Sequence, residues 1–164
     1  MNFPVILIAA LVPMIMGFIW YNPKVFGNIW MRESGLTLES MKGANMAKTL
    51  ILTFIFSFLI AVMLQMLVIH QFHLQSIVMG DPDLKNPDSE LSIMMKNFID
   101  KYGRNYRTFK HGAFHGTFAG IALILPIIAT NAIYERRSVK YIFVVSGFWI
   151  ISFALMGGIL CQWA

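Results

Sequence analysis

Hydrophobic and charged residues are segregated along the chain into four apolar blocks and the polar segments that join them. The blocks cover about residues 3–21, 49–71, 112–134 and 141–163, and every Lys, Arg, Asp and Glu lies outside them. Each block approaches or exceeds the ~20 residues that a helix needs to cross ~30 Å of hydrocarbon. The pattern therefore predicts an all-α fold, in which residues 1–164 form a single polytopic domain built as a four-helix transmembrane bundle.

A further helical signal follows the first block. Asn22 can cap a helix with Pro23 at its first position, and Phe26 and Trp30 recur at helical spacing. This predicts a short amphipathic helix in the membrane interface, and the alternative is a loop whose aromatic side chains pack against the bundle. The residues of this interfacial motif are Trp20, Tyr21, Pro23, Phe26, Gly27 and Trp30.

Two more helices are predicted outside the apolar blocks. Thr37 can cap a helix that we expect to continue through Lys48 into the second span. The polar loop at residues 76–110 contains an amphipathic pattern over about 89–102, with apolar residues three and four positions apart. We expect this amphipathic helix at residues 89–102 to lie on the membrane surface or to cover the mouth of the bundle.

Composition agrees with a protein whose first partner is the lipid bilayer. Of the 164 residues, 57% are hydrophobic and 13% are charged, against about 45–50% and about 25% in soluble domains. The net charge of +5 does not indicate a nucleic-acid partner, because the basic residues flank the spans and no recognition motif accompanies them. The single cysteine, Cys161, allows no intrachain disulfide and gives no metal-cluster spacing.

The loop charges bear on orientation. The two connections on one side hold seven Lys and Arg, against six in the central loop on the other side, so the count alone decides nothing. The compact cluster of Arg136, Arg137 and Lys140 favours placing its side in the cytoplasm. We therefore expect a multi-pass protein of the bacterial inner membrane with both termini in the periplasm.

Glycines recur every four residues at the start of the third block. On a helix, Gly112, Gly116 and Gly120 form one bare stripe that another helix can approach closely. Gly157 and Gly158 supply a similar surface in the fourth block. The pattern predicts helix packing, and the partner is either another span of the chain or a second copy.

All four histidines lie at one membrane face, because the second span leaves the membrane on the side from which the third enters. His70 and His73 end the second block, and His111 and His115 begin the third. Imidazole ligates zinc, copper, iron and haem. A metal or haem site, a proton-sensing or proton-relay site and structural hydrogen bonding are the alternatives, and the sequence favours the last. It predicts no resident cofactor.

Several features of enzymes and transporters are missing from the sequence. No span contains a charged residue of the kind that ion-coupled transporters and voltage sensors usually need. Phosphate-binding glycine loops, HExxH and a credible Ser/His/Asp set are also missing. These observations favour a non-enzymatic packing or interaction protein, acting as a homo-oligomer or an accessory subunit. The alternative is a small-molecule or ion pathway gated by the histidines.

One segment carries a resemblance to a known family. Residues 12–30, VPMIMGFIWYNPKVFGNIW, resemble the Gly-x-x-Trp-Tyr…Phe-Gly…Trp signature of a small bacterial membrane family, domain of unknown function 1761. The stretch 109–116, the short basic third connection and the late glycine pair also agree, so the resemblance covers nearly the whole chain. The long central loop is similar to that of Bacteroidetes members. The resemblance implies a four-helix inner-membrane protein of unassigned activity and supplies no catalytic residues.

Overall fold

The computed structural model describes residues 2–164, and this range contains helices but no strand. Four helical segments are long and apolar enough to cross a membrane: α1 (Phe3–Trp20), α4 (Met46–Val68), the segment Phe109–Tyr134 and α9 (Val139–Trp163). The predicted all-α architecture with four spans is therefore confirmed. The chain is built as a multi-pass membrane protein.

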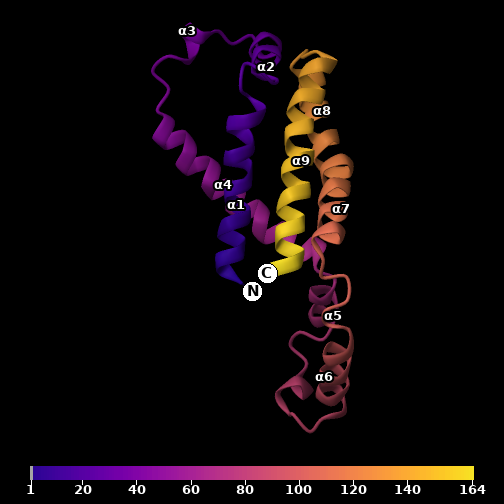
Figure 1. Cartoon of the computed structure of the whole chain (residues 1–164). Coiled ribbons are helices and arrows are strands. Elements are labelled where there is room, and N and C mark those ends of the chain that lie inside the picture. Colours follow the sequence, from indigo (N-terminus) through magenta and orange to yellow (C-terminus); the bar gives the residue numbers. More distant parts are fainter. Residues whose placement is uncertain (1) are drawn as a thin grey trace.

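The helix α9 is the centre of the bundle (Figure 1). The third span packs along it, while α1 and α4 contact both α9 and each other. α4 is strongly tilted, so that its first half diverges from the other spans and its last turns reach the base of the third span (Figure 1). Buried side chains from α1, α4 and α9 meet in one core, which includes Ile6, Ala9, Ala61, Leu64, Met156 and Leu160.

Polar capping residues set where three of the spans begin. The side chains of Asn45, Thr108 and Ser138 each accept a hydrogen bond from the backbone N–H three residues further on, at 3.0–3.3 Å. Such caps satisfy N–H groups that the first turn of a helix leaves unpaired. The spans therefore begin at residues 46, 109 and 139, slightly before the apolar blocks that hydrophobicity alone defines.

The segment before α4 departs from expectation. A short helix, α3 (Leu38–Met41), begins at the cap Thr37 but does not continue into the second span. Gly43 has a left-handed backbone with φ of 86°, a conformation that breaks the helix and that glycine adopts without steric cost. The predicted continuous helix through Lys48 is wrong because Gly43 and the new cap at Asn45 interrupt it.

The interfacial motif forms a corner between α1 and α9. A helix is present, α2 (Gly27–Ser34), but it starts after Pro23 rather than at it. Trp20 donates a hydrogen bond from its indole Nε1 to the carbonyl of Val144 in α9, at 3.0 Å. The Tyr21 ring lies 5.0 Å from that of Trp30 and 5.2 Å from that of Phe148 in α9, measured between centroids. The motif thus combines the two alternatives, a short helix and aromatics packed on the bundle.

The third span is interrupted by a π-helical turn. It consists of α7 (Phe109–Ala119), the turn η2 (Gly120–Ile124) and α8 (Leu125–Tyr134). Pro126, at the start of α8, has no backbone N–H to donate to the preceding turn. A wider turn before a proline accommodates the lost hydrogen bond. The irregularity of the third span therefore lies in the turn before Pro126.

The central loop folds into a small lobe, which we define as residues 71–106. It contains α5 (Gln71–Ile77), the 3₁₀ turn η1 (Pro82–Lys85) and α6 (Glu90–Tyr102). The Gln71 amide donates to the carbonyl of Asn105 at 3.0 Å, which ties the two ends of the lobe together. Figure 1 shows that the lobe projects beyond the end of the bundle where both termini lie. α6 therefore does not cover the bundle mouth, and α5 is a helix that the sequence did not predict.

Candidate metal centre

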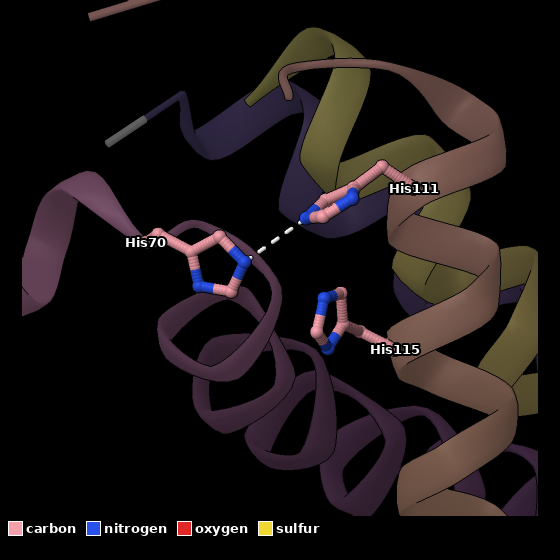
Figure 2. Close-up of side chains that lie close together, drawn as sticks. All are labelled: His70, His111 and His115. Carbon is pink, nitrogen blue, oxygen red and sulfur yellow. Dashed lines mark hydrogen bonds between the residues drawn. The ribbon is translucent and has the colours of Figure 1, made fainter. Parts of the chain in front are cut away.

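Three histidines converge where the lobe joins the bundle. His70 follows the last turn of α4, and His111 and His115 lie one turn apart on α7. Figure 2 shows their rings turned toward one another across the gap between the two helices. The Nε2 atoms of His70 and His111 are 3.0 Å apart, and one ring nitrogen from each of the three lies within 4.8 Å of the others. His70 is exposed and the other two are half-buried.

The fourth histidine does not join this cluster. His73 lies on α5 and lines a separate cavity of about 410 Å³, together with Gln65, Phe72, Gln75, Ser76 and Met79. α4 ends at Val68, and the turn before α5 sends His70 and His73 in different directions. From the sequence, all four histidines were expected together because they lie near the adjoining ends of the second and third spans. The structure brings only three of them together.

Fixed backbone positions hold the cluster. Thr108 caps α7 and accepts a hydrogen bond from the backbone N–H of His111 at 3.3 Å. Ile69, immediately before His70, is 1% exposed, so the chain is anchored in the core one residue from the cluster. The side chains touch edge to face, with 4.9 Å between the ring centroids of His70 and His115 and 4.5 Å between those of His111 and His115.

Tyr106 is a neighbour of the cluster that the sequence did not reveal. Its ring lies 5.2 Å from that of His111, tilted by 32°. Its backbone has φ of 62°, a left-handed conformation that is rare for an aromatic residue and costs about 1–3 kcal/mol. The Tyr106 carbonyl accepts hydrogen bonds from the backbone N–H of Thr108 and from the thiol of Cys161. The strained residue therefore joins the lobe, α7 and α9 beside the histidines.

The glycine stripe presses the helix that carries two of the histidines against α9. A Cβ atom at Gly112 or Gly116 would overlap the backbone carbonyls of Gly157 and Phe153, respectively. A Cβ at Gly120 would lie 2.8 Å from the Cα of Ile150. Gly157 faces Gly112, and Gly158 faces the ring of Phe109. The stripe thus packs on another span of the same chain and fixes the height of His111 and His115 in the bundle.

This arrangement suits a single transition-metal ion. In a tetrahedral site with Zn–N bonds of ~2.0–2.1 Å, ligand nitrogens are ~3.4 Å apart. The nitrogens of the cluster, 3.0 Å apart in one pair and within 4.8 Å overall, bracket that separation. Among residues 2–164 no carboxylate or thiolate joins the group, so an ion bound here would be held by three imidazoles, which ligate in their neutral form. Zn²⁺, Cu²⁺, Fe²⁺ and Ni²⁺ all accept such ligands.

Haem fits the cluster less well than a bare ion. Haem iron offers two axial positions, one on each side of the macrocycle. His111 and His115 project from one helix face, so only one of them could pair with His70 across a haem, and the other would be left out of the coordination. Three imidazoles that converge on one point instead match an ion with three protein ligands and one open position.

A family model described as "Protein of unknown function (DUF1761)" matches residues 4–161, nearly the whole chain. The protein belongs to the DUF1761 family. No curated protein and no solved structure matches it. Membership confirms the resemblance carried by the aromatic segment at residues 12–30.

Within this DUF1761 chain, the family-like segment and the histidine cluster lie at opposite ends of the bundle. Trp20 and Val144 meet near the start of α9, whereas Gly112 and Gly157 meet near its end, next to His111. α9 therefore connects the aromatic corner to the histidine cluster. Its central position makes it the scaffold on which both are aligned.

Proposed function

We propose that this DUF1761 protein binds one divalent transition-metal ion at a membrane face, through His70, His111 and His115. One observation carries the proposal: a ring nitrogen from each histidine lies within 4.8 Å of the other two. Histidine is the commonest protein ligand for such metals. Because two ligands come from α7 and the third from the residue between α4 and the lobe, the ion would link the third span to the end of the second.

The bound ion would keep one coordination position free of protein. Three protein ligands with an open fourth position distinguish reactive zinc sites from closed structural ones. The open position gives the ion a place to take water or an anion. This supports a ligand-binding metal site rather than a purely structural one.

The broader hypothesis of a packing or interaction protein also stays a proposal. This hypothesis was based first on the glycine stripe. In the structure, α9 of the same chain packs against the stripe. An oligomer or a complex with another membrane protein would have to use a different surface. The location in a bacterial inner membrane and the periplasmic termini likewise rest on the four spans and the basic Arg136–Lys140 connection.

A histidine-gated pathway makes a different prediction from a static site. A pathway would give zinc flux into liposomes that His111→Ala abolishes, whereas a binding site gives stoichiometric retention without flux. Both measurements use the same purified protein, so one preparation separates the two hypotheses.

The test of the metal site is a titration of the purified, chelator-treated protein with Zn²⁺, and with Co²⁺ as a spectroscopic probe. We expect one ion per chain and a visible Co²⁺ spectrum of tetrahedral type. Single Ala variants of His70, His111 and His115 should each weaken binding by more than the ~10–100-fold that follows loss of a second-shell partner. His73→Ala is the matched control, because its ring lies outside the cluster.

Two outcomes would overturn the proposal. The first is a wild-type protein that takes up no stoichiometric Zn²⁺ or Co²⁺. The second is binding that His73→Ala weakens as much as His111→Ala does, which would indicate unspecific association with surface imidazoles.

A further inference from the structure

An apolar groove runs between α4 and the third span, with α9 as its floor. Its volume is about 410 Å³, within the ~300–1,000 Å³ of small-molecule sites. The groove is lined by Leu59, Ile60, Met63, Leu64, Leu67, Ala119, Leu123 and Phe153. Met63 and Leu123 are 65% and 55% exposed, so the groove is open along the side of the bundle. At this height the surrounding medium is lipid.

Helix register connects the groove to the histidine cluster. On α7, His115 and Ala119 are four residues apart, so they lie on the same face, and His111 lies one turn earlier. On the opposite wall, Leu67 comes one turn before His70. Each wall of the groove is therefore separated by one helical turn from a histidine of the cluster. The groove itself is lined only by apolar residues, and the histidines lie next to it rather than in its lining.

Charge determines what should occupy the end with the histidines. A divalent ion held by three neutral imidazoles keeps its full double positive charge, since the cluster contains no carboxylate. An anionic group at the open position would neutralise this charge. A ligand that fills both regions must combine an apolar chain with an anionic head.

We infer that the metal site and the groove together bind a long-chain carboxylate, with the acyl chain in the groove and the carboxylate on the ion. This inference rests on the proposed metal-binding function and names the ligand class of that same site. Carboxylate oxygen binds Zn²⁺ directly. Because the groove is open to lipid, a two-chain phospholipid is the competitor that the experiment has to exclude.

The experiment measures binding of spin-labelled stearate to the protein in detergent micelles, before and after loading with Zn²⁺. We expect saturable binding to the zinc-loaded protein and about tenfold to 100-fold weaker binding after chelation, as for loss of a charge-assisted contact. The methyl ester of the same stearate, which lacks the anionic head, should bind as weakly in both states.

Groove-filling variants test where the chain lies. Met63→Trp and Leu123→Trp place a bulky ring in the groove at lipid-exposed positions, and each should weaken stearate binding about tenfold or more. Phe118→Trp is the matched control. Phe118 lies on the same span as Leu123, is 62% exposed and does not line the groove. All three variants should bind Zn²⁺ like the wild type.

The outcomes separate the two proposals. If Zn²⁺ binds but stearate does not, or if stearate and its ester bind equally, the inferred ligand is wrong and the metal site stands. If phosphatidylglycerol displaces stearate at equal concentration, the ligand is a phosphate lipid and the carboxylate assignment falls. Stearate binding that persists without Zn²⁺ uptake would overturn both the metal site and its role in holding the head group.

Discussion

Gly112 and Gly157 lie back to back, and a Cβ atom built on either residue would overlap the carbonyl oxygen of the other. This mutual contact, like that between Gly116 and Phe153, marks a very close approach of α7 to α9. It lies one residue from His111, so helix packing and the geometry of the candidate metal centre depend on the same contact.

Gly112→Ala and Gly157→Ala should therefore destabilise the protein, each by about 1–3 kcal/mol, the usual cost of overpacking. Gly17→Ala is the control, because a Cβ there would meet nothing within 4 Å, and it should leave stability unchanged or raise it by up to about 1 kcal/mol. Thermal unfolding in detergent measures the difference. Equal melting temperatures for all three variants would show that the contact does not set the helix distance.

Binding of Zn²⁺ should raise the thermal stability of the protein. A ligand that binds only the folded state stabilises it by about 2.7 kcal/mol at a concentration 100 times its Kd. We expect a higher melting temperature with Zn²⁺, reversed by chelation and absent in His70→Ala. His73→Ala should respond like the wild type, and an equal response of His70→Ala would contradict the assignment of His70 as a ligand.

Glu33 should make stability depend on pH in the acid range. Its carboxylate accepts a hydrogen bond from the Ser138 hydroxyl at 2.5 Å and further bonds from the Arg32 side chain. These bonds, that of Ser138 foremost, hold the pKa of Glu33 below its ordinary value. Because the folded pKa lies below the unfolded value of about 4.3, the stabilisation is present above that pH and is lost as the pH falls through the folded pKa.

The measurement for this prediction is the melting temperature from neutral pH down to below about pH 4. The wild type should lose more stability over this range than Glu33→Gln, which cannot ionise. Glu39→Gln changes a carboxylate on exposed α3 and serves as the control. Parallel pH profiles for the wild type and Glu33→Gln would contradict the prediction.

Arg107 closes the end of α9 and should stabilise both the helix end and the metal centre. Its guanidinium donates from Nε to the carbonyl of Cys161 at 2.6 Å, and its terminal nitrogen donates to the carbonyl of Ala164. Arg107→Lys keeps the charge but cannot donate two parallel bonds. We expect a loss of about 1.5–3 kcal/mol and weaker Zn²⁺ binding, because the segment that Arg107 anchors leads directly to His111.

Arg104→Lys is the matched control for this variant, since the Arg104 side chain makes no hydrogen bond or ion pair to the part of the chain that the structure describes. Its melting temperature and Zn²⁺ affinity should equal those of the wild type. If Arg107→Lys behaves in the same way, Arg107 does not anchor the segment.

Gln65 should be less favourable than an apolar residue of similar shape. Its side chain is 0% exposed, and neither its amide nitrogen nor its oxygen has a hydrogen-bond partner among residues 2–164. A buried polar group without a partner costs about 1–3 kcal/mol. Gln65→Met should therefore raise the melting temperature. A lower melting temperature would show that the amide makes a polar contact in the membrane.

Sequence reasoning predicted the spans because hydrophobicity and charge alternate in long blocks, which is a property of many residues together. The glycine stripe and the aromatic motif were also visible as patterns. The break at Gly43 and the π-turn at Gly120–Ile124 were not, because each depends on the conformation of one or two residues. Propensity gives such single positions little weight.

The candidate site was only partly predictable for a similar reason. His111 and His115 share a helix face by their spacing, but the positions of His70 and His73 depend on where α4 ends and how the chain turns into α5. Tyr106 became visible only through its left-handed backbone, φ 62°, and its contact with His111. Neither feature has a sequence signature, since Asn or Gly would be the usual residue in that conformation.

The central position of α9 has a consequence for biogenesis. The third span emerges from the ribosome before the fourth, yet most of its tertiary contacts are with that last helix, α9. Until that helix enters the bilayer, the bare glycine surface of the third span faces lipid without its partner. The first two spans can pack on each other before this step, but the third has its main partner only after the final insertion event, which completes the bundle and fixes the positions of His111 and His115.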